Sequence, residues 1–210
     1  MTASSDKTRR QDRVPMREQP ARQRVANFDE VPYGYSLEEA IAEAQRCLRC
    51  KKPLCVTGCP VNVNIPAFVG AIADGDIRQA IRILKSSNTL PAICGRVCPQ
   101  ETQCEVRCVL GKKGLPVSIG NLERFAADWE RELGQVDIPE REAPTGRRVA
   151  VVGSGPAGLT CAGELARRGH DVVVFEALHA PGGVLVYGIP EFRLPKRIVK
   201  AEIDNLRAMG

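Results

Sequence analysis

The sequence predicts an α-helical N-terminal domain followed by the βαβ start of an α/β doubly wound domain, which is incomplete within this chain. Apolar residues recur at helical spacing in the first part, whereas short apolar runs flank a glycine-rich turn in the second. A polar segment rich in turn formers separates them. We therefore expect a basic arm over residues 1–26, a helical domain over 27–134, a linker over 135–146 and the second domain over 147–210.

The first predicted helix begins with a capping box, in which Ser36 and Glu39 satisfy each other's backbone N–H groups. Its apolar stripe continues as far as Leu48. This extent would place Cys47 and Cys50, three residues apart, on one face at the C-terminal end of the helix.

Three more helices complete the predicted helical domain. One follows Pro66 and ends near Gly75, the next covers about 76–86, and the last covers about 118–133. Each has apolar residues on one face. The second group of cysteines is expected in a short irregular stretch before the last helix.

The second domain begins with a continuous apolar run over 147–152, which is typical of a strand buried in a parallel sheet. A glycine-rich turn and a helix over 156–168 follow, and a second strand covers 171–176. Another helix is expected over about 196–209. This order is the βαβ start of a doubly wound fold.

Eight of the nine cysteines form two blocks of four, and each block contains a Cys-x3-Cys-Pro element. Thiolates at such spacing, with proline directly after a cysteine, are the ligand pattern of cubane iron–sulfur clusters. The sequence therefore predicts two 4Fe–4S clusters in a ferredoxin-like helical domain. The eight candidate ligands are Cys47, Cys50, Cys55, Cys59, Cys94, Cys98, Cys104 and Cys108.

Zinc sites and disulfides are the alternatives for these cysteines. Zinc ribbons usually carry two Cys-x2-Cys pairs, and only Cys47 and Cys50 have that spacing. Disulfides are rare where thiols stay reduced, and the N-terminus lacks the apolar core of a secretory signal. We therefore favour iron–sulfur clusters over zinc sites and disulfides. We also expect the protein to be cytoplasmic.

The glycine-rich turn lies between a strand and a helix, and an acidic residue ends the next strand, which is the full context of a dinucleotide-binding site. Glycines allow the tight turn, the approach of a pyrophosphate and close packing of the helix. The carboxylate suits an unphosphorylated ribose, as in FAD or NAD. The candidate residues are Gly153, Gly155, Pro156, Ala157, Gly158, Glu176 and Gly183.

Charge and composition exclude several other classes of function. The net charge of +5 is modest, and it is concentrated in residues 1–26, which we interpret as a solvated, partly disordered arm. A docking arm for an acidic partner is the alternative. Aromatic residues do not alternate with these cations, so we expect no nucleic-acid binding. No apolar run reaches membrane-spanning length, so no membrane association is expected.

No catalytic side chain is predicted. Cys161 lies outside both cysteine blocks, and we expect it to be a small buried residue. The two histidines, His170 and His179, lie beside loops and are expected at the surface.

The motifs CLRCKKPLCVTGCP, CGRVCPQETQCEVRC, VAVVGSGPAGL and APGGVLVYGIPEFRLPK resemble those of the small NADPH subunit of bacterial glutamate synthase. Close relatives are the large subunit of NADH-dependent ferredoxin:NADP oxidoreductase and the N-terminal part of dihydropyrimidine dehydrogenase. The resemblance implies FAD at the glycine-rich turn and an NADPH site beyond Gly210. The family's proteins are longer, so we expect this chain to be C-terminally truncated.

The resemblance also implies how the cysteines are shared between clusters. Carried over from the family, Cys47, Cys50, Cys55 and Cys108 hold one cluster, and Cys59, Cys98 and Cys104 hold three corners of the other. The eighth ligand is either Cys94 or Glu123.

The leading hypothesis is an electron-relay subunit of an NADPH-linked flavoenzyme. Electrons would pass from FAD through two clusters to a partner, most simply the glutamate synthase large subunit, for glutamate synthesis from 2-oxoglutarate and glutamine. Ferredoxin:NADP transhydrogenation, with another electron-accepting partner, is the nearest alternative. A non-catalytic electron-transfer module is the alternative from a different class.

Overall fold

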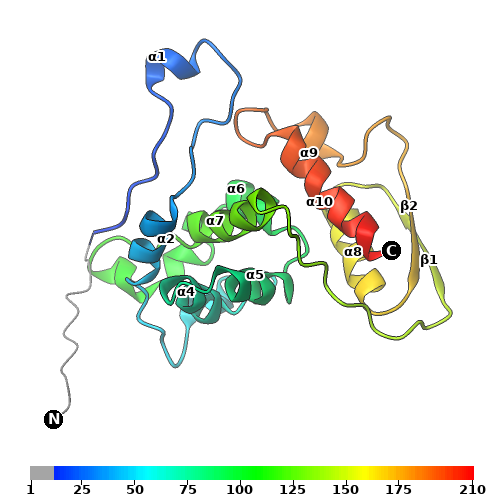
Figure 1. The fold of residues 1–210 in the computed structure, drawn as a ribbon, viewed down its shortest axis with the longest axis horizontal. Helices are drawn as coiled ribbons and strands as arrows, with labels where there is room; N and C mark the ends of the chain where they lie inside the picture. Colours follow the sequence, from blue (N-terminus) through cyan, green and yellow to red (C-terminus); the bar gives the residue numbers. More distant parts are fainter. Residues whose placement is uncertain (1–11) are drawn as a thin grey trace.

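The computed structural model describes residues 12–210 and contains a helical domain and a small α/β unit, shown in Figure 1. Its strands are β1 (Arg148–Val152) and β2 (Asp171–Phe175), and three short 3-10 turns are η1 (Gln100–Thr102), η2 (Glu105–Arg107) and η3 (Val109–Lys112). The helices are α1 (Ala21–Arg24), α2 (Leu37–Ala44), α3 (Leu54–Thr57), α4 (Ile65–Ala73), α5 (Ile77–Lys85), α6 (Pro91–Val97), α7 (Ile119–Glu132), α8 (Pro156–Arg167), α9 (Val184–Tyr187) and α10 (Lys196–Met209). No helix of the described part is long and apolar enough to cross a membrane.

The core of the helical domain lies among α2, α4, α5, α6 and α7. Leu84 of α5 and Leu122 of α7 are fully buried there, as the helical pattern of the sequence predicts. The predicted capping box is confirmed, since Ser36 and Glu39 bond each other's backbone N–H groups. Asp76 caps α5 in a similar way by accepting from the N–H of Gln79 at 2.9 Å.

The predicted extent of the first helix is wrong. The helix α2 ends at Ala44, and Cys47 and Cys50 lie in the irregular chain beyond it rather than on a helix face. Arg49 has a φ of 47°, which a continued α-helix does not allow. Its guanidinium bonds the carbonyl of Gly70 at 3.0 Å, so a contact with α4 stabilises the turn.

The second cysteine block is not wholly irregular, because it contains the helix α6. Pro91 opens this helix and Cys94 lies inside it. Gly95 lets α6 cross α7 closely, since a Cβ on this residue would lie 2.4 Å from the backbone nitrogen of Arg124. The sequence prediction missed α6 because its glycine and adjacent cysteines are also typical of loops.

Residues 13 and 14 pack against the helical domain, unlike the solvated arm expected for this part of the sequence, whereas residues 20–26, which include α1, are exposed as expected. Val14 is buried, its N–H donates to Glu43 at 2.7 Å, and its carbonyl accepts from the Tyr35 hydroxyl at 2.6 Å. Arg13 forms an ion pair with the buried Glu105 at 3.0 Å. Apolar burial and paired charges therefore hold this stretch. The rest of the predicted arm, residues 1–11, lies outside the described residues.

The α/β unit has the predicted βαβ order. The strands β1 and β2 are parallel, with Arg148 opposite Asp171 and Val152 opposite Phe175. The helices α8 and α10 lie between this sheet and the helical domain (Figure 1). The strands are less buried than the apolar run suggested, because Val152 is 88% exposed and Phe175 is 56% exposed.

Candidate functional site

The eight cysteines of the two blocks surround two separate cavities, and all are free thiols. Cys47, Cys50, Cys55 and Cys108 line the first cysteine cavity, of about 30 Å³. The second cysteine cavity, of about 140 Å³, is lined by Cys59, Cys94, Cys98, Cys104 and Glu123 among others. Each cavity therefore takes side chains from both sequence blocks. Within residues 12–210, no three His, Cys, Asp or Glu side chains have the arrangement that one metal ion requires.

The first cysteine cavity is a poor environment for thiolates without a compensating positive charge. Burial, together with the neighbouring Cys108 and Cys47 sulfurs, raises the pKa of Cys55 to about 11. Burial also raises the pKa of Cys47, again with Cys108 as a neighbour. Four thiolates this close repel one another, so a cationic group between them suits this donor set. The residues present therefore fit an iron–sulfur cluster.

The second cysteine cavity contains a buried carboxyl group as well as thiols. Burial and the Cys98 sulfur raise the pKa of Glu123 to about 8. Burial raises the pKa of Cys104 to about 12. In contrast, a hydrogen bond from the Cys94 thiol lowers the pKa of Cys98 to about 7. Among the cysteines of this cavity that have a shifted pKa, Cys98 is therefore the most easily deprotonated.

Asn88 connects the two candidates for the eighth ligand. Its side-chain amide donates to Glu123 Oε1 at 2.7 Å, and its Oδ1 accepts from the Cys94 sulfur at 3.6 Å. The same Oδ1 accepts from the N–H of Leu90 at 3.0 Å just before α6. The sequence analysis missed Asn88, although an asparagine shortly before a proline that opens a helix is a recognisable turn signal.

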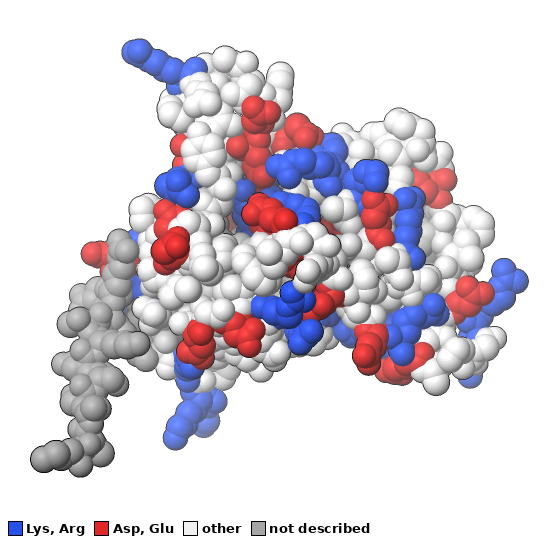
Figure 2. Space-filling model, viewed as in Figure 1, with Lys and Arg blue, Asp and Glu red and all other residues white. Residues whose placement is uncertain are grey.

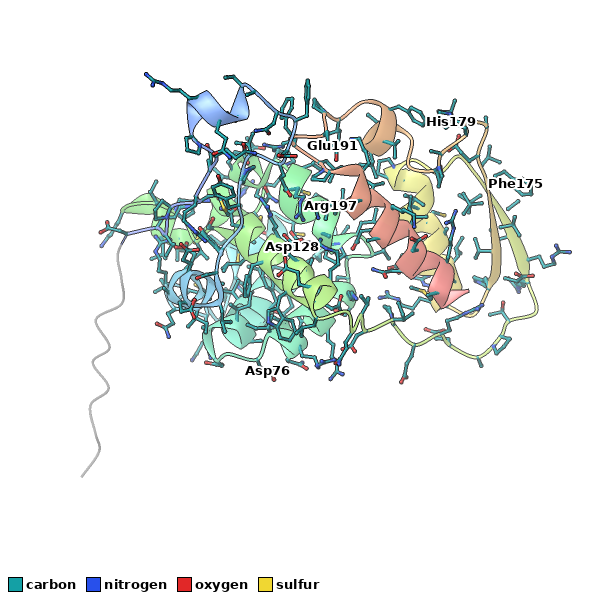
Figure 3. All side chains as sticks on the ribbon, turned by 45° about the horizontal axis from the view of Figure 1, so that its top comes forward. Asp76, Asp128, Phe175, His179, Glu191 and Arg197 are labelled. Atoms are coloured by element: carbon teal, nitrogen blue, oxygen red, sulfur yellow. The ribbon has the colours of Figure 1, made fainter. Side chains whose placement is uncertain are left out.

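A buried ion-pair network fixes the helix that carries Cys94. The guanidinium of Arg96 bonds Asp128 of α7 at 2.7 and 2.9 Å and Glu30 at 2.7 Å. Arg124 of α7 also pairs with Glu30, at 3.1 Å. Arg197 of α10 approaches Glu30 to 4.0 Å, and Figure 3 labels Arg197 and Asp128. The network therefore joins α6 and α7 to the segment before α2.

The glycine-rich turn has the geometry of a phosphate-binding loop. Gly153 has a φ of 91°, which favours glycine, and a Cβ on Gly158 would lie 2.0 Å from the Gly153 carbonyl. A Cβ on Gly155 would meet no protein atom within 4 Å, so the backbone is open to a ligand at that point. Pro156 and Ala157 then begin α8, whose first N–H groups are available to a pyrophosphate.

Glu176 lies beside this turn and helps to shape it. Its carboxylate accepts from the Ser154 hydroxyl, from the Ser154 N–H at 3.0 Å and from the Leu178 N–H at 2.8 Å. The bond from Ser154 is the main reason that its pKa falls to about 2. Gly183 meets the turn from the other side, because a Cβ there would lie 2.9 Å from the Gly155 Cα. The structure thus brings all the predicted dinucleotide residues together.

The helix of the dinucleotide site also borders the second cysteine cavity. Thr160 of α8 lines that cavity, and a Cβ on Gly163 of α8 would lie 3.1 Å from Thr89. Arg167, at the end of α8, donates to the carbonyls of Lys85 and Ser86 at 3.2 and 2.9 Å. The second cavity therefore lies in the helical domain and borders the α/β unit at Thr160.

Other residues considered from the sequence lie away from the cysteine cavities. Cys161 is exposed, which contradicts its expected burial. His179 contacts the ring of Tyr187, and Figure 3 places it near Phe175, at the outer side of the α/β unit. His170 is half-buried and contacts Thr145 at 2.7 Å.

Comparisons with known proteins match both parts of the chain. A family model described as dihydropyrimidine dehydrogenase domain II, 4Fe-4S cluster, matches residues 24–135, and one described as an NAD(P)-binding Rossmann-like domain matches residues 151–194. The chain is 39% identical over 198 residues to the glutamate synthase [NADPH] small chain of Escherichia coli K12. The aligned region covers 94% of this chain and 42% of that protein.

Two further relatives match the chain with similar identity and coverage. The glutamate synthase [NADPH] small chain of Halomonas elongata is 38% identical over 191 residues, 91% of this chain and 40% of its own length. The NAD-dependent dihydropyrimidine dehydrogenase subunit PreT of Escherichia coli K12 is 37% identical over 183 residues, 87% of this chain and 44% of its own length. The chain thus spans about two fifths of the curated relatives it matches.

Proposed function

The chain belongs to the family of the dihydropyrimidine dehydrogenase 4Fe-4S domain, together with the glutamate synthase small chains, and from this premise we propose that it relays electrons between a flavin and a protein partner. In this proposal FAD binds at the turn between β1 and α8, and one 4Fe–4S cluster binds in each cysteine cavity. The flavin supplies exchange between two-electron and one-electron chemistry when bound, while the chain binds, orients and shields the cofactors.

The observation that carries this proposal is the position of the second cysteine cavity. Thr160, which lines it, belongs to the same helix that begins with the dinucleotide turn. The two cavities are also close to each other, because Cys55 of the first lies in α3 and Cys59 of the second follows two residues after the end of this helix. The proposed order is therefore dinucleotide, second cavity, first cavity.

We propose Glu123 as the eighth ligand, with Cys94 as its supporting neighbour. The single S–H of Cys94 is shared between two acceptors, the Cys98 sulfur and Asn88 Oδ1, the latter at 3.6 Å. A thiol that donates to a ligating thiolate tunes that ligand and need not bind iron itself. Glu123 lines the same cavity from α7 and is held by Asn88.

The partner and the overall reaction are proposed from the relatives. Glutamate synthase small chains are subunits of an NADPH enzyme, so the proposed acceptor is a large subunit that makes glutamate from 2-oxoglutarate and glutamine. The likeness to PreT supports a second candidate, in which the acceptor is a different subunit. A non-catalytic relay module remains the alternative for residues 1–210 by themselves.

Electron uptake by the anaerobically reconstituted chain tests the relay. With FAD and both clusters bound, a dithionite titration should consume about four electrons per chain, two in the flavin and one in each cluster. The matched variant is Gly155→Ala, because its added methyl group meets no protein atom within 4 Å. Without added FAD, this variant should have the melting temperature and the cluster signals of the wild type, and with FAD it should take up only about two electrons. Unchanged FAD binding in Gly155→Ala would contradict the proposed dinucleotide site.

A further inference from the structure

Five exposed cations gather around the first cysteine cavity. They are Lys51, Lys52, Arg107, Lys112 and Lys113, which we call the basic rim. Arg107 lines the cavity, the two lysines at 51 and 52 directly follow the lining residue Cys50, and the other two end the 3-10 turn η3. One cation of the rim therefore lines the first cavity, and the other four lie in segments that directly follow its lining residues.

The basic rim is not neutralised by the chain itself. None of its members forms an ion pair in the part of the chain that the structure describes, whereas Arg49 nearby pairs with Asp74 at 2.6 Å. The segments 47–66 and 106–118 contain no aspartate or glutamate at all. Glu105, just before the second segment, is buried against Arg13. Unpaired like charges at one site favour an external acidic partner.

Apolar side chains are exposed beside these cations. Leu54 is 47% exposed and Leu115 is 59% exposed, and Leu48 and Val106 are also exposed. Leu48 and Leu54 also line the cavity. Apolar contacts with a charged, solvated rim are the usual composition of a protein–protein interface.

The position of the rim fits an exit point for electrons. The loop between α2 and α3 and the turn η3 lie at the end of the helical domain away from the sheet (Figure 1). Lys and Arg side chains project from this lower left edge in Figure 2. The second cavity, by contrast, faces α8 through Thr160. A redox partner at the rim would therefore approach the cavity that is farther along the proposed relay.

We propose that the basic rim and its exposed leucines dock a redox protein or subunit that presents an acidic surface. The inference rests on the proposed relay and adds the chemistry of its acceptor. A protein fits this surface better than a nucleic acid, because segments 47–66 and 106–118 contain no aromatic side chain on which a base could stack. Complementary charge would steer the acceptor to the cavity where an electron leaves the chain.

Charge reversal tests the docking surface in the full reconstituted chain. The test variant carries Lys51→Glu, Lys52→Glu, Lys112→Glu and Lys113→Glu, and acidic rubredoxin is the probe. The dissociation constant of rubredoxin should be about tenfold higher or more for the test variant than for the wild type at low ionic strength. This difference should shrink in high salt. Carbodiimide cross-links between rubredoxin and the rim lysines should be lost as well. Unchanged binding, or tighter binding of basic cytochrome c to the wild type, would overturn the proposal.

Two controls separate docking from the relay itself. The variant Arg147→Glu with Arg168→Glu changes exposed arginines of the α/β unit and should bind rubredoxin as the wild type does. Oxidation by the uncharged quinone menadione should be equally fast in the wild type and the rim variant, because it needs no charged docking site. If menadione oxidises neither the wild type nor the rim variant, the proposed relay is contradicted, but the proposed docking surface is not. Binding of duplex DNA at the rim more tightly than rubredoxin would contradict the choice of a protein partner.

Discussion

Glu123 and Cys94 show how single side chains can take different roles in one cavity. Both lie beside Asn88, yet only Cys94 is hydrogen-bonded to Cys98. A direct ligand holds an iron, whereas a neighbour that donates to a ligand adjusts its charge. The two roles predict different consequences when each side chain is shortened.

Glu123→Ala should leave one iron of the second cluster without a protein ligand. We expect that cluster to lose an iron on oxidation and to give the EPR signal of a three-iron cluster. Cys94→Ala should keep all irons and shift only the reduction potential, because a hydrogen bond to Cys98 is lost. Cys161→Ala, at an exposed position, is the control. The reverse pattern, with iron lost from Cys94→Ala alone, would assign the eighth ligand to Cys94.

Glu202 of α10 is buried where α10 faces the helical domain. Burial raises its pKa to about 8, with Lys85 opposing the shift and Glu130 adding to it. The unfolded chain releases this proton at a lower pH than the native chain does, so the stability falls as the pH rises from about 4.5 through 8.

Glu202→Gln should therefore stabilise the protein at pH 9 and have little effect at pH 4. The expected gain is a few kcal/mol, since each pKa unit corresponds to about 1.4 kcal/mol. Urea unfolding at the two pH values measures it, with the exposed Glu140→Gln as the control. A gain at pH 4 that equals the gain at pH 9 would show that the carboxyl proton is not responsible.

Local signals were enough to predict many residues of the site. The turn at Gly153 requires a positive φ, and the cysteine spacings indicate clusters, so both could be predicted from neighbouring residues. The role of Asn88 could not, because it depends on Glu123, which lies 35 residues away. Contacts of that kind exist only after α6 and α7 have packed.

At the scale of elements, the crossing of α6 and α7 controls the shape of the second cavity. The two helices carry Cys94 and Glu123, and Gly95 allows their close approach. The sequence predicted α7 from its long apolar stripe but missed α6, which is short and mixes cysteine with glycine. It also extended the helix before Cys47 too far, since the bend at Arg49 depends on a contact with α4.

Gly95→Ala should push α6 away from α7 and destabilise the fold. The added methyl group would lie 2.4 Å from the Arg124 nitrogen and 2.6 Å from its Cα, which are backbone atoms that cannot rotate away. We expect a loss of about 1–3 kcal/mol in the free energy of unfolding and a lower occupancy of the second cluster. Chemical denaturation and iron analysis measure both effects.

Gly114→Ala is the matched control for this prediction. A Cβ at that position meets no atom within 4 Å, so the fold should be unaffected. Equal stability of the two variants would show that the helix crossing is not as close as the structure indicates.

At the scale of the whole molecule, the chain places three sites in sequence, from the α/β unit to the far end of the helical domain. The dinucleotide turn begins α8, α8 borders the second cavity, and α3 connects the second cavity to the first. The order of helical domain and βαβ unit could be predicted from sequence periodicity. The position of α8 against the second cavity could not, because it depends on packing between side chains that are far apart in the sequence.

The iron and sulfide content of the anaerobically reconstituted chain tests the central claim most directly. Two 4Fe–4S clusters require about eight irons and about eight inorganic sulfides per chain. We expect this stoichiometry together with two distinguishable cluster signals in Mössbauer and EPR spectra. A colourless protein that binds about two zinc ions instead, one per block of four cysteines, would contradict the account.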